Sequence, residues 1–200
     1  MYKKYIKRGI DFFASLFAIC LLWPLFLLIA ILIKLDSKGP VFFKQKRLGR
    51  HGKEFEILKF RSMCIGAETM GSKQYSFEGD PRITRVGNIL RKTSLDEIPQ
   101  FINILKGDMS LIGFRPPLTY HPYKYEDYTE EQKRMFDLRP GVTGWAQVNG
   151  RKQIDWNKRI ELNIWYSNNI SFILDCKIVI LTIYKILKNE NNTNIGKTIK

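Results

Sequence analysis

An uncharged stretch near the N-terminus, FFASLFAICLLWPLFLLIAILI at positions 12–33, constrains this chain more than any other feature. At about 1.5 Å of rise per residue, a helix of this length could cross the roughly 30 Å hydrocarbon core of a membrane. The stretch is too long for the apolar core of a signal peptide, and no A-x-A-like cleavage site follows it. A helix buried in a protein core fits so long an uncharged run less well. The sequence therefore predicts a membrane-inserted helix.

Two features argue against a simple crossing of the membrane. Pro24 lies near the middle of the stretch, where it removes a backbone hydrogen bond and bends a helix. Lysines and arginines flank both ends, and the positive-inside tendency keeps such flanks on the cytoplasmic side. A segment with both ends on one side must enter, bend at Pro24 and leave by the same face. A re-entrant helix and a single-pass helix both stay open at this point.

The composition is that of a folded and strongly basic protein. The 200 residues can bury one core, and a hydrophobic content of 44% argues against disorder. Lys and Arg number 33 against 19 Asp and Glu, so the net charge of +14 predicts anionic partners such as acidic lipid, phosphorylated small molecules or nucleic acid. The three cysteines lie far apart and form no disulfide framework, and the two histidines lack partners at zinc spacing.

Regular structure is expected in three further parts of the chain. Residues 39–63 alternate in part around a turn at 49–52, which predicts a β-hairpin. Apolar residues recur at helical spacing over 83–105. A helix is also expected over 128–138, where Thr129 serves as N-cap and acids occupy the first turn.

The segments between and after these elements differ in character. Residues 64–80 and the glycine-punctuated 139–151 are expected to be loops. Residues 171–188 are apolar around most of a helical wheel, with Asp175 and Thr182 on its polar arc. That pattern suits a helix lying in the membrane interface, with ordinary core packing nearly as good an interpretation.

Two adjacent acids, Asp96 and Glu97, stand out in this basic chain. The segment SLDE at 94–97 matches a capping box, in which Ser94 and Glu97 would close a helix N-terminus. Alternatively, one acid is a nucleophile toward phosphorus and its neighbour helps to hold a metal ion. Such an attack brings anion to anion and needs a divalent cation and guanidinium groups. Arginines around the pair and in Gly/Pro-rich turns beyond it favour this second interpretation. They are Arg82, Arg85, Arg91, Arg115, Arg139 and Arg151.

Most of the chain resembles the bacterial sugar transferase family, the monotopic phosphoglycosyl transferases that begin glycan assembly on a polyprenyl phosphate. The likeness runs from KRGIDFFASL through KFRSM, DPRITRVGNILRKTSLDEIPQFINILKGDMSLIGFRP and RPGVTGWAQVNGR to LDCKIVILTIYKIL. It implies a re-entrant helix over 1–38, kinked at Pro24, and a catalytic domain over 39–200 on the cytoplasmic face of the bacterial inner membrane. The expected fold is mainly α with a small β-hairpin (α+β), in which interfacial amphipathic helices surround the compact catalytic domain.

The resemblance also implies a reaction and its site. The reaction is the Mg²⁺-dependent transfer of a sugar 1-phosphate from a UDP-sugar to polyprenyl phosphate, with release of UMP. Asp96 would be the nucleophile that forms a covalent phosphosugar intermediate, and Glu97 would work with it at the metal. The family's phosphate- and substrate-binding residues fall on Lys59, Arg91, Arg115, Gln147, Asn149 and Arg151. Positions that depart from the family pattern are Trp23, Phe114 and Asn163.

Two other functions are weaker alternatives. A non-catalytic membrane adaptor would bind anionic lipid through its basic face, at about 1 kcal/mol per cation near the surface. A nucleic-acid partner is not expected, because the sequence contains no RNP, helix-turn-helix or zinc-finger signature.

Overall fold

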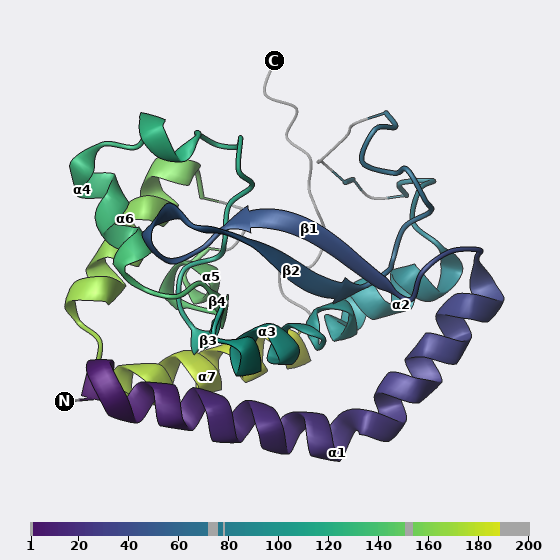
Figure 1. Ribbon diagram of the computed structural model, residues 1–200, viewed down its shortest axis with the longest axis horizontal. Helices are drawn as coiled ribbons and strands as arrows, with labels where there is room; N and C mark the ends of the chain where they lie inside the picture. The colour runs from purple at the N-terminus through teal and green to yellow at the C-terminus, as the bar shows by residue number, and fades with distance from the viewer. Residues whose placement is uncertain (1, 72–75, 78, 151–153, 189–200) are drawn as a thin grey trace.

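A computed structural model describes residues 2–71, 76–77, 79–150 and 154–188. Within these residues the protein is mainly helical, with an antiparallel hairpin, a short parallel strand pair and a long N-terminal helix (Figure 1). The predicted α+β class is confirmed at this level. The elements are a π-helical turn at Tyr2–Ile6, α1 (Lys7–Asp36), β1 (Phe42–Leu48), a 3₁₀ turn at Arg50–Gly52, β2 (Glu54–Phe60), α2 (Arg85–Thr93), a 3₁₀ turn at Leu95–Glu97, α3 (Gln100–Lys106), β3 (Ser110–Ile112), a 3₁₀ turn at Tyr125–Asp127, α4 (Glu130–Lys133), a 3₁₀ turn at Arg134–Asp137, β4 (Gly141–Thr143), α5 (Trp145–Val148), α6 (Trp156–Asn168) and α7 (Phe172–Leu187).

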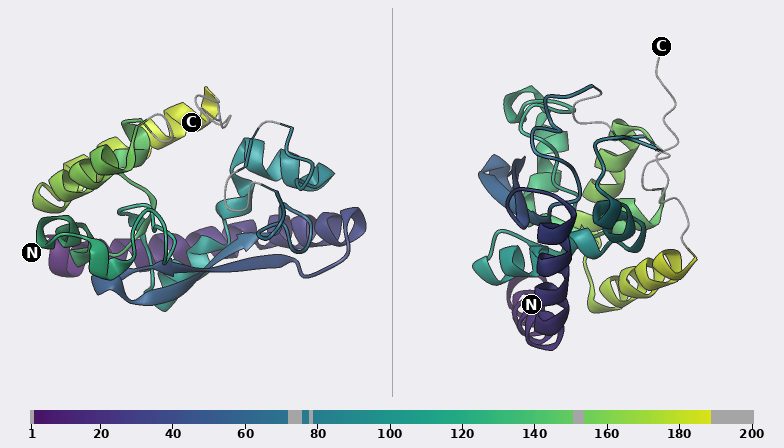
Figure 2. Two further views of the ribbon diagram at one scale, coloured as in Figure 1. Left: turned by 90° about the horizontal axis from the view of Figure 1, so that it is seen from above. Right: turned by 90° about the vertical axis from the view of Figure 1, so that its right-hand side faces the viewer.

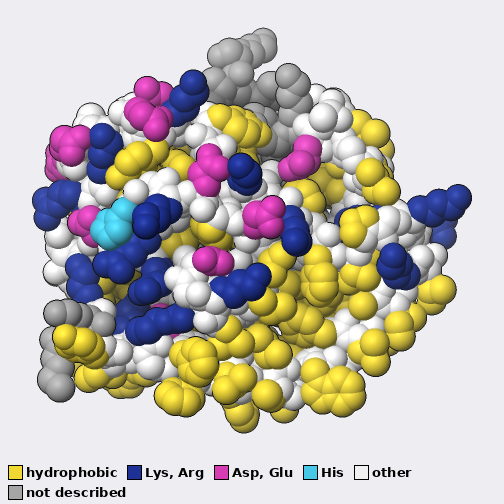
Figure 3. Space-filling model, in the orientation of Figure 1, with side chains coloured by type: hydrophobic (Ala, Val, Ile, Leu, Met, Phe, Trp, Pro, Cys, Tyr) yellow, Lys and Arg dark blue, Asp and Glu magenta, His cyan; other side chains and the backbone are white. Residues whose placement is uncertain are grey.

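α1 is the long apolar helix expected from the sequence, and it is bent. It continues over Lys7–Asp36 with Pro24 inside it, and Figure 1 shows two straight stretches joined at an angle. A proline inside a helix removes one backbone hydrogen bond and clashes with the preceding turn, which accounts for the bend. The helix is long and apolar enough to cross a membrane, and only 11% of its most apolar window is buried. Its exposed apolar side chains form the band along the lower edge of Figure 3.

The first half of α1 is attached to the body of the protein by polar contacts. Arg8 donates to the backbone carbonyls of Ile104, at 2.7 Å, and Leu105, at 3.3 Å, in α3. The buried Asp11 carboxylate accepts from the backbone N–H of Leu111, in β3, at 3.1 Å. Arg8 thus adds donors to the carbonyls of the last turn of α3, and Asp11 pairs with the start of β3.

The far end of α1 is attached to the same body. Arg61 follows β2 and donates to the carbonyl of Ser37, at 2.8 Å, and to that of Lys38. Asp36 accepts from the backbone N–H of Val86, at 2.9 Å, in the first turn of α2, where a carboxylate is favourable. The whole of α1 therefore lies along one protein body rather than leaving it at one end.

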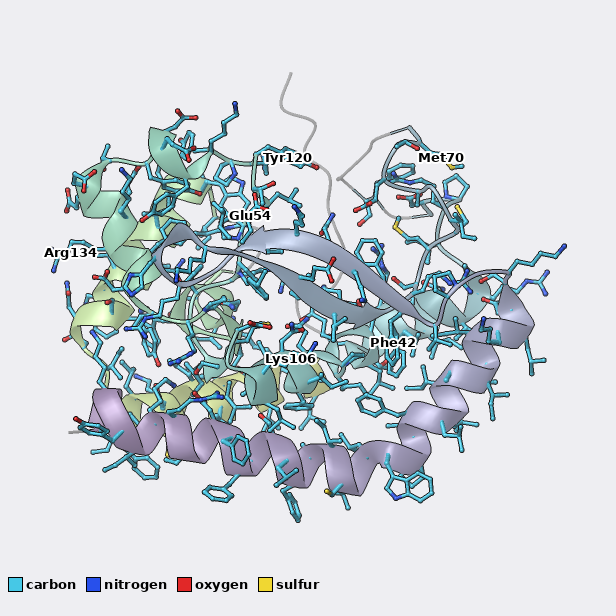
Figure 4. All side chains as sticks on the ribbon, in the orientation of Figure 1. Phe42, Glu54, Met70, Lys106, Tyr120 and Arg134 are labelled. Atoms are coloured by element: carbon cyan, nitrogen blue, oxygen red, sulfur yellow. The ribbon has the colours of Figure 1, made fainter. Side chains whose placement is uncertain are left out.

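β1 and β2 form the predicted hairpin. Their pairing runs from Phe42 opposite Phe60 to Leu48 opposite Glu54. The turn between them falls where it was expected, and Gly52 takes a left-handed φ of +72° there. Figure 4 labels Phe42 and Glu54, the first residues of the two strands. The hairpin carries Lys59 toward the acid pair.

The helical spacing over 83–105 corresponds to two helices, α2 and α3. Thr84 is the N-cap of α2 and accepts from the backbone N–H of Gly87 at 2.9 Å. α2 ends at Thr93, and Ser94 then takes a left-handed conformation with φ of +59°. The left-handed conformation of Ser94 turns the chain out of the helical path, so α2 and α3 are separate helices.

The expectation that 139–151 is all loop was wrong in part. β4 pairs in parallel with β3, with Ser110 opposite Gly141 and Ile112 opposite Thr143. α5 begins two residues after β4 ends. The glycines of this region serve close backbone approach: a Cβ at Gly113, Gly141 or Gly144 would collide with neighbouring backbone. The same residue type that marks a loop in sequence therefore permits a tight strand pair here.

α7 confirms the helix expected over 171–188, with Ser171 as its N-cap. Asp175, on the polar arc of this helix, is buried. Its carboxylate accepts from the Tyr166 hydroxyl at 2.5 Å, the Tyr2 hydroxyl at 2.7 Å and the Lys7 ammonium at 2.8 Å. The right-hand view of Figure 2 shows α7 and α1 on the same, lower side of the molecule.

Candidate active site

The acid pair lies in a sharp turn between two helices. Asp96 and Glu97 occupy the 3₁₀ turn Leu95–Glu97, which follows the left-handed Ser94 and precedes α3. The Ser94 side chain makes no capping hydrogen bond, so the capping-box interpretation of SLDE was wrong. Glu97 is turned instead toward cations from distant parts of the chain.

Glu97 is held by two of the predicted cations. Its Oε1 lies 2.6 Å from the Lys59 ammonium on β2 and 3.1 Å from an Arg115 nitrogen after β3. Burial by itself would raise the pKa of Glu97, but Lys59 and Arg115 outweigh it and hold the pKa far below its usual range. Glu97 is therefore an anion with a fixed orientation.

Asp96 has the opposite character. Its carboxylate accepts no hydrogen bond from any residue that the structure describes, and its side chain is only half-buried. Burial raises the pKa of Asp96, the cation at Lys59 opposes that rise, and the charge of Glu97 adds to it. Two neighbouring acids with pKa values pushed apart are typical of a pair with divided chemical roles.

Both acids open into a cleft of about 1280 Å³. One side of the cleft is basic and polar, with Lys59, Arg91 and Arg115 among its lining residues. Another side is formed by α7, which contributes Ile183 and Ile186. α7 also contributes Thr182 and Lys185, so this wall is mainly rather than wholly apolar. A cleft that combines cations with a mainly apolar wall suits a substrate pair in which phosphate meets hydrocarbon.

The structure brings most of the predicted site residues into this cleft. Arg91 donates to the Ser62 hydroxyl at 3.0 Å, and burial lowers the pKa of Arg91. Gln147 also lines the cleft, and its buried amide has no hydrogen-bond partner among the described residues. Such an unsatisfied group calls for a ligand or water. Asn149 is exposed, does not line the cleft and donates to the Trp145 carbonyl at 2.8 Å.

The structure locates two of three further positions that the sequence singled out. Arg151 lies outside the described residues. Asn163, where the family pattern differs, is buried and lines the cleft. Phe114, another departure, is buried in the core against Phe136, with ring centroids 5.2 Å apart.

Cleft residues that sequence analysis missed include Arg47 on β1 and Trp156 with Arg159 on α6. These residues lie neither near the acid pair in sequence nor in glycine-rich turns, where the other cleft cations were expected. A tryptophan and an arginine three positions apart share a helix face, and that spacing was the available signal.

The carboxylates of the cleft could hold a metal ion only with help from a substrate. The described residues contain no group of three or more His, Cys, Asp and Glu side chains able to share a metal. Asp80 lines the cleft too, but Arg82 engages both its oxygens at 2.9 and 2.7 Å. Mg²⁺ is typically bound through one or two carboxylates, with substrate phosphates and water completing its shell, so Asp96 and Glu97 fit that ion.

Comparison with known proteins assigns the family. The bacterial sugar transferase family model matches residues 2–189. The uncharacterized sugar transferase EpsL of Bacillus subtilis is 45% identical over 186 residues, which is 92% of this chain and 89% of EpsL. The chain therefore belongs to the bacterial sugar transferase family, and the prediction of a phosphoglycosyl transferase is confirmed.

Two longer relatives have more specific names. The UDP-N-acetylgalactosamine-undecaprenyl-phosphate N-acetylgalactosaminephosphotransferase of Aeromonas hydrophila is 45% identical over 92% of this chain and 44% of its own length. The UDP-glucose:undecaprenyl-phosphate glucose-1-phosphate transferase of Escherichia coli is 41% identical over 92% of this chain and 41% of its own length. This chain thus spans less than half of each of these two relatives. The alternative of a non-catalytic adaptor finds no support in these names.

Proposed function

We propose that this protein transfers a sugar 1-phosphate from a UDP-sugar to a polyprenyl phosphate, with release of UMP, as the first membrane step of glycan assembly. The main support is the unequal acid pair, in which Asp96 opens to the cleft without a hydrogen bond from the described residues while Glu97 is fixed by Lys59 and Arg115. The names of the relatives, which join a UDP-sugar or a sugar phosphate to undecaprenyl phosphate, agree with it.

The reaction would proceed in two successive nucleophilic displacements at the same phosphorus atom. An oxygen of the Asp96 carboxylate attacks the phosphorus that bears the sugar, and the bond to the bridging oxygen breaks. UMP leaves with that electron pair, and the sugar phosphate stays on Asp96. An oxygen of the lipid phosphate then attacks the same phosphorus, which transfers the sugar phosphate and restores the carboxylate.

The cations of the cleft would make this attack possible. Asp96 must be ionised to attack, and Lys59 and Arg91 lower its pKa against the effects of burial and Glu97. Arg115 with these two side chains would neutralise the diphosphate of the donor. Asp96 and Glu97 are the residues that we propose to hold Mg²⁺, which when bound would supply further positive charge at the diphosphate. Gln147, Asn149 and Arg151 remain the predicted substrate-binding residues.

We further propose that 1–38 forms a re-entrant helix bent at Pro24, on the cytoplasmic face of the bacterial inner membrane, with α7 in the interface. Because both ends of α1 bind one protein body, a straight crossing would have to detach one of them. α7 exposes Ile173, Ile180 and Leu187, as an interfacial helix would. Cysteines placed at Lys3 and Lys38 should therefore react with an impermeant reagent on the same side of the membrane. Reaction on opposite sides would establish a single-pass helix.

The covalent step is tested by trapping. The protein is incubated with Mg²⁺ and each member of a UDP-sugar panel, without lipid acceptor, and analysed by mass spectrometry. We expect about one equivalent of UMP and a phosphosugar adduct on Asp96 for the correct donor. Asp96→Asn should give neither, whereas Asp155→Asn, at the exposed N-cap of α6, should behave as wild type. Lipid-linked product formed without any adduct would refute Asp96 as the nucleophile.

A further inference from the structure

A second group of cations lies on the cleft wall, apart from Lys59 and Arg91. It consists of Arg47 on β1 and Arg159 on α6, both half-buried. The Arg159 guanidinium lies over the Trp156 ring, 4.7 Å from its centroid, and its Nε donates to the Ile154 carbonyl at 3.1 Å. This cation–π contact and this hydrogen bond fix where Arg159 points.

The Arg47 side chain is also fixed by hydrogen bonds. Its Nε and one terminal nitrogen donate to the Gln45 side-chain oxygen, at 3.0 and 2.5 Å. Its other terminal nitrogen donates to the Pro116 carbonyl at 3.1 Å, and the next strand residue, Leu48, donates its backbone N–H to Pro117 at 3.0 Å. These hydrogen bonds attach β1 at Arg47 and Leu48 to Pro116 and Pro117, the two residues that follow Arg115.

These two arginines lack the acid partners that Arg115 has. Among the described residues, neither Arg47 nor Arg159 forms an ion pair with a carboxylate, whereas Arg115 pairs with Glu97. Burial and then the charge of Arg115 lower the pKa of Arg47 to about 10, and the same two causes lower the pKa of Arg159. The charge of Arg115 is unfavourable for both Arg47 and Arg159, so an anion bound in the part of the cleft that they line would stabilise them.

Arg115 is close to both groups of charges. It forms an ion pair with Glu97 of the acid pair, and the next residue, Pro116, accepts a hydrogen bond from Arg47 at 3.1 Å. A diphosphate has two neighbouring anionic groups. If the phosphate that is transferred lies against Asp96, its partner phosphate would lie farther along the same cleft, which Arg47, Arg115 and Arg159 line.

We propose that Arg47 and Arg159, with Arg159 held by Trp156, form a subsite for the nucleoside monophosphate half of the donor, which departs as UMP. This inference rests on the proposed function, because it needs a donor with a diphosphate. The apolar α7 wall, with Ile183 and Ile186, suits the hydrocarbon of the acceptor instead. The subsite would bind the leaving group, and the acid pair would carry out the transfer.

Direct binding of UMP tests the subsite. UMP is titrated calorimetrically into the full chain in detergent, without sugar or lipid, for wild type, Arg47→Gln, Arg159→Gln and Arg134→Gln. Arg134 pairs with Asn168 at 3.1 Å at the left edge of Figure 4 and does not line the cleft, so its variant is the matched control. We expect each of the first two variants to bind UMP about 10-fold more weakly or worse, because a charge-assisted hydrogen bond is lost. The control should match wild type.

A second titration separates the two sources of phosphate. A water-soluble short-chain prenyl phosphate is titrated into the same four proteins. Weaker prenyl phosphate binding with unchanged UMP binding in both cleft variants would overturn the assignment to the nucleotide, as would a wild type that does not bind UMP. If UMP binding weakens but no UDP-sugar yields lipid-linked product, the proposed function fails and the subsite stands. If product forms while both variants bind UMP as wild type does, the subsite alone fails.

Discussion

Asp175 and Asp96 are both acids beside cations, yet their surroundings differ in almost every respect. Asp175 is buried between α6, α7 and the N-terminus and accepts hydrogen bonds from Tyr166, Tyr2 and Lys7. Asp96 lies in a turn at the cleft and accepts none from the described residues. Each acid has a lysine nearby. Lys7 pairs directly with Asp175, whereas Lys59, the lysine near Asp96, pairs with the neighbouring Glu97.

The difference separates an acid that holds the fold from one that is available for chemistry. A buried carboxylate with three good donors joins the elements that supply them, and here it joins α7 to the start of α1. A carboxylate that burial destabilises and no donor satisfies is retained at a cost in stability. Substitutions at the two positions should therefore have opposite effects on stability and on activity.

The largest effect expected is loss of activity in Asp96→Asn. Asparagine keeps the size of the side chain but cannot attack phosphorus, so turnover should fall by at least about 1000-fold. UMP release in the presence of donor and acceptor measures this. If Asp96→Asn kept more than a small fraction of wild-type turnover, with a circular dichroism spectrum that shows the native fold, Asp96 would not be the nucleophile.

The second effect is a loss of stability in Asp175→Asn. Removing the charge leaves the Lys7 ammonium, only 12% exposed, without its partner, which typically costs about 3–5 kcal/mol in free energy of unfolding. Denaturant unfolding in detergent measures it. The double variant Lys7→Met with Asp175→Asn should be less destabilised than the sum of the single variants. Additive losses would show that Asp175 and Lys7 do not act as a pair.

The two regions also differ in how far the sequence predicts them. The α7 helix follows from its apolar periodicity and its Ser171 cap, both of which are local. The burial of Asp175 does not, because two of its partners lie 168 and 173 residues away in the chain. Sequence periodicity placed this acid on a polar arc of the helix, and only the tertiary contacts show that this arc faces the protein interior at Asp175.

At the acid pair the sequence suggested two local interpretations, and the structure contradicts one of them. The pattern SLDE satisfies the rule for a capping box, but Ser94 turns left-handed and makes no cap. Glu97 instead pairs with Lys59 and Arg115, which lie 38 and 18 residues away in the chain. These long-range ion pairs determine its orientation, and the local capping pattern does not. The family resemblance singled out the acid pair, and its catalytic role stays a prediction. Nothing in the local sequence around Arg47 indicates that it lines the same cleft, because its contact with Pro116 is 69 residues away in the chain.

The third prediction concerns the pH dependence of kcat/KM at the acid pair. Activity should rise with pH as Asp96 loses its proton, because only the carboxylate attacks. Lys59 lowers the pKa of Asp96 and Glu97 raises it. The acidic limb should therefore move to higher pH in Lys59→Gln and to lower pH in Glu97→Gln, measured on the residual activity of each variant. A shift of both variants in one direction would contradict the assigned electrostatics.

The smallest expected effect is a gain in stability in Asp96→Asn, opposite in sign to the loss at Asp175. The folded-state pKa of Asp96 is raised, so the folded protein binds more protons than the unfolded chain between the two pKa values. Below the unfolded pKa of about 3.9 both states are protonated and the group has no influence. As pH rises through the folded pKa, ionised Asp96 destabilises the wild type, and asparagine avoids that penalty. The melting temperature of Asp96→Asn without metal should therefore exceed that of wild type near neutral pH, and the difference should shrink as the pH falls. A variant less stable than wild type at neutral pH would mean that Asp96, like Asp175, is held by donors in the fold.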